Sequence, residues 1–115
     1  MAIITSHLLN GTDGTHAGGI PVSLYNRATR ELLLAAETDK GGRVSLEVED
    51  HRVDPSGSYE LVFSVGGYWS ARSIQRAGSQ IMYEIVLRIA MPNPAGRYHV
   101  PVIVSPNTYS VWWST

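Results

Sequence analysis

Short apolar runs separated by turn-forming residues are the feature that most constrains this fold. Val44-Ser45-Leu46-Glu47-Val48 and the run 59–65 place apolar side chains at every second position, which is the period of a half-buried strand. Clusters of Gly, Pro, Asn and Asp, such as residues 10–14 and 92–96, interrupt the runs and mark turns. This pattern predicts strands over residues 3–9, 21–25, 32–36, 44–48, 59–65, 81–89, 98–104 and 108–113. About eight short strands at this spacing predict an all-β, two-sheet Greek-key sandwich.

Two segments need a more specific prediction. Residues 68–77 show no alternation and are expected to form one short surface helix. In the run 81–89, one face of the strand is expected to carry Ile81, Tyr83, Ile85, Leu87 and Ile89. The chain has 115 residues and no internal repeat, so we expect a single domain over residues 1–115.

Composition excludes several classes of function. The net charge of −1 and the charged fraction of 17% give no electrostatic reason to expect nucleic acid or an anionic membrane as a partner. The absence of cysteine excludes disulfides, thiolate metal sites and a cysteine nucleophile. No apolar stretch approaches the roughly 20 residues of a membrane helix, and residues 1–7 do not resemble a secretory signal. We therefore expect a soluble cytoplasmic protein.

Three separated segments resemble the transthyretin and 5-hydroxyisourate hydrolase family. The first contains Ile4-Thr5-Ser6-His7-Leu8-Leu9-Asn10 and continues at residues 17–22, the second is Thr38-Asp39-Lys40-Gly41-Gly42-Arg43, and the third is Tyr98-His99-Val100-Pro101-Val102-Ile103-Val104-Ser105-Pro106. Residues 57–72 match the middle strand and the following helix of the family. The resemblance covers nearly the whole chain and implies a transthyretin-like sandwich.

The resemblance also implies an active site. The hydrolase branch of the family keeps two histidines and an arginine, which His7, Arg43 and His99 match. The implied activity is opening of a cyclic amide or ureide ring of an oxidised purine or related heterocycle by histidine-assisted attack of water, without a metal or other cofactor. The family further implies a homotetramer, with its sites in a channel at the dimer–dimer interface.

These residue types suit that chemistry. An imidazole with an unperturbed pKa of about 6.5 can accept and return protons near neutral pH. A guanidinium stays charged and offers a rigid fork of donors to carbonyls and an oxyanion. A zinc site built on His7, His99 and a third histidine is conceivable, but no H-x-x-x-H or H-x-H spacing supports it. His16 and His51 are interpreted as structural or solvent-exposed.

The C-terminal residues depart from the family pattern. Counted without gaps from His99, the closing Tyr-Arg-Gly-Ser of the hydrolases falls on Trp112, Trp113, Ser114 and Thr115. We expect Trp112, Trp113 and Thr115 to bind substrate, and the two tryptophans, adjacent on a predicted strand, to point to opposite sides. Loss of the arginine removes a bidentate cation and leaves a flat π surface. Asn10, in place of the usual Asp, and Gly41, also in place of Asp, are further departures.

Two alternatives remain open at this point. One is a paralogue recruited to specialised metabolism, which performs ring opening or cyclisation on a more apolar heterocycle; the tryptophans at 112 and 113 motivate it. The other is a non-catalytic carrier of a small ligand. The retained histidines and arginine count against a carrier.

Overall fold

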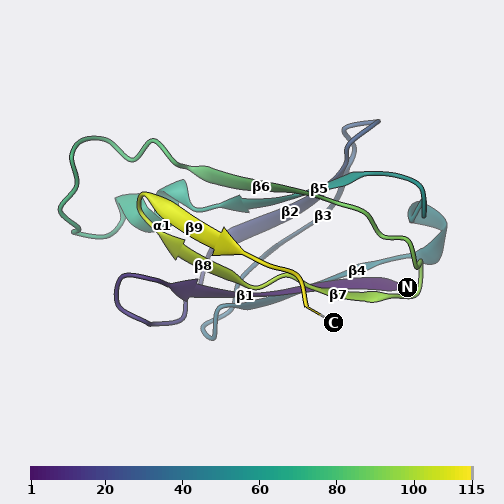
Figure 1. Ribbon diagram of the computed structural model, residues 1–115, viewed down its shortest axis with the longest axis horizontal. Coiled ribbons are helices and arrows are strands. Elements are labelled where there is room, and N and C mark those ends of the chain that lie inside the picture. The colour runs from purple at the N-terminus through teal and green to yellow at the C-terminus, as the bar shows by residue number, and fades with distance from the viewer. Residues whose placement is uncertain (115) are drawn as a thin grey trace.

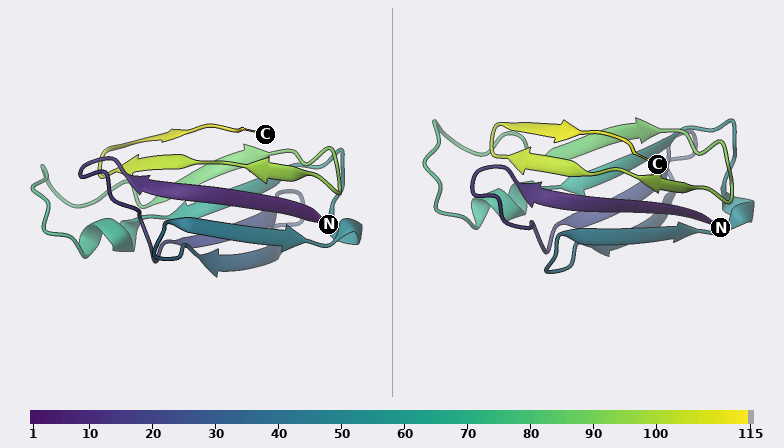
Figure 2. Two further views of the ribbon diagram at one scale, coloured as in Figure 1. Left: turned by 90° about the horizontal axis from the view of Figure 1, so that it is seen from below. Right: turned by 60° about the horizontal axis from the view of Figure 1, so that its bottom comes forward.

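The computed structural model describes residues 1–114 and shows two β-sheets packed face to face (Figures 1 and 2). The strands are β1 (Ala2–Asn10), β2 (Pro21–Asn26), β3 (Leu32–Glu37), β4 (Arg43–Val48), β5 (Tyr59–Ser64), β6 (Glu84–Ile89), β7 (Arg97–His99), β8 (Val102–Ser105) and β9 (Thr108–Val111). A 3-10 helix η1 (Asp50–Arg52) follows β4, and the helix α1 (Gly66–Ser70) follows β5. The predicted two-sheet sandwich with a short helix is confirmed.

The first sheet has the order β4-β1-β8-β9, with β7 also paired to β1, and the second has the order β3-β2-β5-β6. β1 is antiparallel to β4 and parallel to both β7 and β8. Thr5 is opposite His99 and Leu8 is opposite Val102, so β7 and β8 lie in one register along β1. Pro101 separates them because proline has no N–H to donate to the ladder. The expected strand 98–104 is therefore two short strands.

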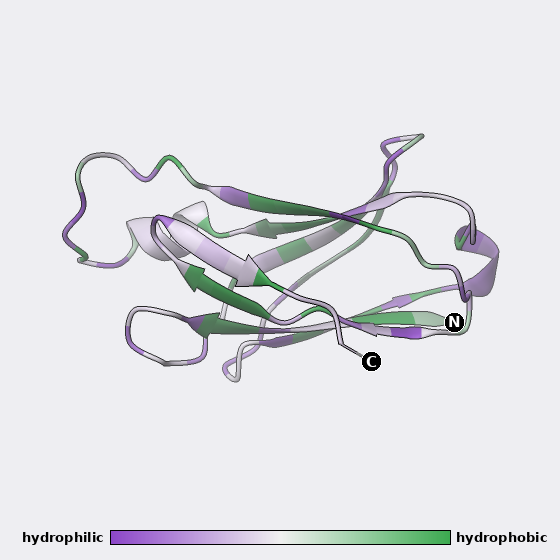
Figure 3. Ribbon diagram, viewed as in Figure 1, coloured by the Kyte–Doolittle hydropathy of each residue, from purple (hydrophilic) through white to green (hydrophobic). Residues whose placement is uncertain are grey.

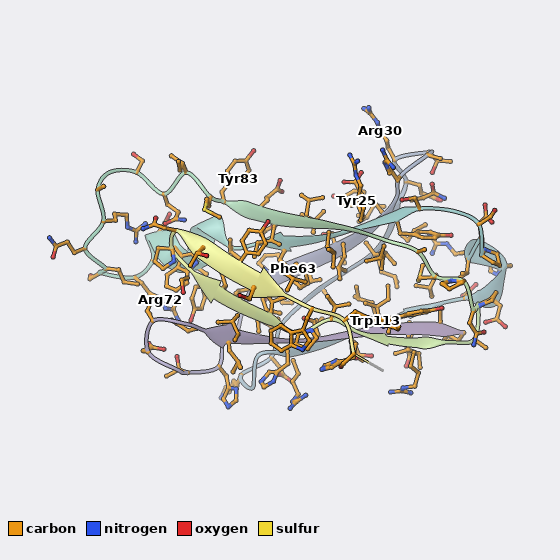
Figure 4. The ribbon with its side chains drawn as sticks, in the orientation of Figure 1. Tyr25, Arg30, Phe63, Arg72, Tyr83 and Trp113 are labelled. Carbon is orange, nitrogen blue, oxygen red and sulfur yellow. The ribbon has the colours of Figure 1, made fainter. Side chains whose placement is uncertain are left out.

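The core lies between the sheets because the strand residues alternate in burial. Along β1 the buried positions are Ala2, Ile4, Ser6, Leu8 and Asn10. Large side chains fill the interior, among them Tyr59, Phe63 and Trp69, and Figure 4 shows Phe63 in the middle of the sandwich. Figure 3 shows hydrophobic residues concentrated in the strands. Each fully buried side chain of this size contributes about 1.5–3 kcal/mol. Because the even-numbered residues of β1 face the core, its odd-numbered residues face outward.

The region between α1 and β6 differs from expectation. The helix covers Gly66–Ser70 rather than 68–77, and Ile81 and Tyr83 lie outside β6 with 83% and 64% of their surfaces exposed. The Tyr83 carbonyl accepts hydrogen bonds from the N–H groups of Val65 and Gly66, at 2.9 and 3.0 Å. These bonds turn the chain before β6, so the alternation of residues 81–83 does not bury them. Within residues 1–114, no helix is long and apolar enough to cross a membrane.

Candidate active site

The outer face of the first sheet brings the three predicted catalytic residues together. His7 of β1 is opposite Arg43 of β4, and Thr5, two residues before His7 on the same face, is opposite His99 of β7. Paired residues project to the same side of a sheet. A pocket of about 400 Å³ opens on this face and is lined by Thr5, Ser6, Asp39, Arg43, Val44, Ser45 and His99.

β1 holds His99 through several bonds. The hydroxyl oxygen of Thr5 lies 2.8 Å from Nδ1 of His99. The next residue, Val100, donates its N–H to the Thr5 carbonyl at 2.8 Å, and its own carbonyl accepts a bond from the buried Ser6 hydroxyl. With Nδ1 held by Thr5, the nitrogen of His99 that remains to meet a substrate is Nε2.

The turn before β4 positions Arg43. Oδ1 of Asp39 accepts hydrogen bonds from the N–H groups of Gly41 and Arg43, each at 2.9 Å. The buried Thr38 hydroxyl accepts from Ile20 N–H and donates to a neighbouring carbonyl. Gly42 has φ +74° and packs against the Leu8 carbonyl, with no room for a Cβ. The motif at 38–43 therefore reflects the geometry of this turn, which places the arginine beside β1.

His7 occupies a distinctly cationic environment. Partial burial, followed by the charges of Arg43, His16 and His99, lowers the pKa of His7 below its ordinary value, and a hydrogen bond to the Gly41 backbone opposes this shift. Each neighbouring positive charge disfavours a further proton on the imidazole. His7 is therefore neutral over a wider pH range than a free histidine.

His16 is the residue of this region that sequence reasoning misses. Nδ1 of His16 lies 3.0 Å from Nε2 of His7, although the sequence alone favours a structural or exposed role for it. Its side chain is indeed exposed. The nine-residue separation matches no strand period or metal motif, and only the path of the loop between β1 and β2 brings the two rings together.

The tail lies beside His99 but borders a different pocket. Ser114 donates its N–H to the His99 carbonyl at 3.0 Å, while Trp112 and Trp113, 45% and 64% exposed, line a mainly apolar pocket of about 410 Å³ with Leu87, Ile89, Tyr98 and Val111. Figure 4 labels Trp113 on this C-terminal segment. β9 ends at Val111, so Trp112 and Trp113 lie beyond the observed strand, and both border this one pocket. Thr115 lies outside the described residues.

No metal centre is evident in the described part of the chain: residues 1–114 contain no group of three or more His, Asp or Glu side chains placed to hold an ion. The side chains at the site supply imidazoles, a guanidinium, hydroxyls and the carboxylate of Asp39. Such a set can move protons, orient water and stabilise an oxyanion.

Sequence comparison identifies the class of protein that carries this fold and site. The model of the HIUase/Transthyretin family matches residues 4–113. The chain belongs to this family. A 5-hydroxyisourate hydrolase of Pseudomonas aeruginosa is 34% identical, over 97% of this chain and 90% of that protein. A 5-hydroxyisourate hydrolase 2 of Rhizobium meliloti is 29% identical, over 95% of this chain and 92% of that protein.

Solved structures agree on the fold. A Klebsiella pneumoniae 5-hydroxyisourate hydrolase superposes with a TM-score of 0.77 at 21% identity and covers 100% of both chains. Transthyretin from Sparus aurata also gives 0.77, at 18% identity over 96% of this chain and 95% of that one. An (S)-allantoin synthase gives 0.82 at 25% identity over 99% of this chain, which spans only 44% of the length of that synthase.

Proposed function

We propose that this protein is a 5-hydroxyisourate hydrolase. The observation that carries the proposal is the register that places His7 opposite Arg43 and Thr5 opposite His99 on one outer sheet face. The curated relatives named above are 5-hydroxyisourate hydrolases that align over nearly the whole chain. Fold alone does not assign a reaction, whereas this cluster supplies the groups that the reaction needs.

In the proposed reaction, a water molecule attacks a carbonyl carbon of the heterocyclic ring. Nε2 of His99, whose Nδ1 is held by Thr5, accepts the proton of the water as its oxygen bonds to that carbon. Arg43 stabilises the negative charge that develops on the carbonyl oxygen. The ring C–N bond then breaks, and His99 returns the proton from Nε2 to the leaving nitrogen. His7, beside Arg43, orients the water, and no metal or organic cofactor takes part.

A direct assay tests the activity. Fresh 5-hydroxyisourate, made by urate oxidase, absorbs in the ultraviolet and decays spontaneously. We expect the protein to accelerate this decay, and we expect His99→Gln and Arg43→Gln to reduce the acceleration by orders of magnitude. A decay rate equal to that without protein would refute the proposed substrate.

We further propose that the substrate-binding residues are Trp112, Trp113 and Thr115. Support comes from the bond between Ser114 and His99, which keeps the tail beside the catalytic face. Replacing Trp113 with alanine should raise KM for 5-hydroxyisourate more than it changes kcat, because a stacking surface contributes to binding. Tyr109→Ala is the matched control, since Tyr109 is an exposed aromatic residue of β9 (43% exposed). Equal KM values for the two variants would refute a binding role for Trp113.

The proposed assembly is a homotetramer whose channel contains the outer face of the first sheet. The half-exposed His7 and His99 and the exposed Arg43 on that face support this placement. Light scattering after size exclusion should give four times the chain mass of 12.6 kDa; a monomer would contradict the proposal.

A cytoplasmic location also stays a prediction, to be tested by fractionation.

The alternative of a recruited paralogue is not favoured. Its motivation is the presence of Trp112 and Trp113 in the tail, where they line an apolar pocket. The curated relatives instead share the name of the urate-pathway enzyme.

A further inference from the structure

The two imidazoles at His7 and His16 form a hydrogen-bonded pair. Nε2 of His7 and Nδ1 of His16 are 3.0 Å apart, within the range of an N–H donor and its acceptor. The ring planes differ by 25° and the ring centroids are 5.1 Å apart. Two rings whose nitrogens are in contact while their centroids are 5.1 Å apart lie edge to edge. Face-to-face stacking would instead bring the whole rings into contact. The contact is therefore a directed bond rather than an apolar one.

The loop between β1 and β2 fixes His16 although its side chain is exposed. Leu9 and His16 form an isolated antiparallel bridge, and the residues on either side of His16 are also bonded to β1: Asn10 N–H donates to the Thr15 carbonyl at 2.8 Å, and Ala17 N–H donates to the Leu8 carbonyl at 2.9 Å. These bonds hold the backbone at position 16 against the strand that carries His7.

A buried amide anchors the same loop. Oδ1 of Asn10 accepts bonds from the N–H and the hydroxyl of Thr12, at 2.8 and 2.6 Å, and Nδ2 donates to the Tyr68 hydroxyl at 3.1 Å. Asp13 in turn accepts two bonds from Thr15. The loop thus has internal bonds along its length, and the place of His16 is specified by the fold.

The hydrogen bond between the two rings restricts where their protons can lie. An N–H···N bond needs one proton between the two nitrogens; protonation of both would set two N–H groups against each other. Arg43 from β4 and His99 from β7 also bring positive charge to His7. These charges oppose a further proton on His7, and whether His7 Nε2 donates or accepts depends on the tautomer of His16.

We propose that His16 is a positioning residue for His7, fixing the orientation of its imidazole and its protonation state through the bond to Nε2. His7 lies opposite Arg43 on the outer face of the first sheet, and His16 acts only through His7. Its effect on turnover rests on the proposed function, whereas its effect on His7 can be measured without any substrate.

The experiment compares three variants of the full-length protein by NMR titration of the histidine side chains, with His7 assigned by its loss in His7→Gln. His16→Asn keeps a polar atom near the place of Nδ1 but removes the titrating ring, and His16→Ala removes both. His51→Asn is the matched control, because His51 is an exposed histidine of η1 whose contact is with Glu49, at 3.3 Å. We expect His7 to titrate at higher pH in both His16 variants, because the ring that helps to lower the pKa of His7 is gone, and to be unchanged in the control.

Kinetics supply the second readout. The acid limb of kcat/KM should move to higher pH in both His16 variants, and His16→Asn should retain more activity than His16→Ala because it can still bond to His7. An unchanged titration of His7 in both His16 variants would overturn the inference, whatever the activity. If the wild-type protein does not hydrolyse 5-hydroxyisourate, the proposed substrate fails, and the titration alone decides the role of His16.

Discussion

The hydroxyl of Thr5 and Nδ1 of His99, 94 residues apart in sequence, lie 2.8 Å from each other across the parallel pair of β1 and β7. This bond leaves Nε2 as the nitrogen of His99 that is available for the proposed reaction. Thr5 thus belongs to the site, although its sequence context identified only the neighbouring His7.

Removing the Thr5 hydroxyl should impair catalysis and lower the stability of the fold modestly. Thr5→Val keeps the shape but loses a bond whose net value is about 0.5–1.5 kcal/mol, so we expect kcat/KM for 5-hydroxyisourate to fall about 2- to 12-fold. Thr108→Val, an exposed position of β9, should retain full activity. Equal kcat/KM values for the two variants would show that Thr5 does not orient His99.

Asp39 should matter more for activity than its contribution to stability suggests. Asp39→Ala loses the bonds to Gly41 N–H and Arg43 N–H, so we expect a lower Tm and a kcat/KM at least tenfold lower, or about 1.4 kcal/mol, as Arg43 loses its position. Asp54→Ala removes bonds of the same kind, which Oδ1 of Asp54 accepts from the N–H and the hydroxyl of Ser56, in a turn far from the site. It should lower Tm but leave kcat/KM unchanged; a parallel loss of activity would mean that turn stability alone explains the Asp39 result.

Gly42 should be intolerant of any side chain. Its positive φ disfavours L residues, and a Cβ would collide with the Leu8 carbonyl, so Gly42→Ala should lower the free energy of unfolding by about 2 kcal/mol or more. Gly14 has a similar φ of +76°, but a Cβ at that position would meet no atom within 4 Å. Gly14→Ala should cost roughly 1 kcal/mol. Urea denaturation of both variants measures the difference, and equal values would contradict the close contact at Gly42.

Stability should decrease as the pH falls below 6.5, in part because of His7. Its pKa in the folded protein is lowered, mainly by burial and then by Arg43 and His16, so below its ordinary pKa of 6.5 the unfolded chain binds more protons at this position. The contribution of His7 is complete above pH 6.5 and is lost as the pH falls through the folded pKa. His7→Gln should show a smaller loss between pH 7.5 and 5 in urea unfolding; an equal loss would show that His7 is not responsible.

The fold was largely predictable because its strands alternate visibly. β4 and β5 show the period of two in their own residues, and proline and glycine clusters mark the ends of strands. The start of β6 was not predictable, because it depends on the Tyr83 carbonyl meeting Val65 and Gly66. No local pattern encodes that contact.

The sequence predicted only those residues of the site that lie in the family motifs. Family resemblance identifies His7, Arg43 and His99, and the register of β1 brings them onto one face. His16 gives no signal, because its place depends on a loop held by the side chain of Asn10. The sequence predicts that the strand continues through the two tryptophans, but its partner strand is interrupted at Pro101. There Trp112 N–H still donates to the Pro101 carbonyl, at 3.3 Å.

The pairing of β1 with β7 has a consequence for biosynthesis. β1 leaves the ribosome well before its partner β7 is translated, and closing so long a segment is entropically costly and slow. Until then, the edge of β1 that will receive β7 and β8 is unpaired and open to self-association. A nascent or truncated polypeptide without residues 97–105 therefore has neither a complete first sheet nor His99, and we expect it to lack the proposed activity.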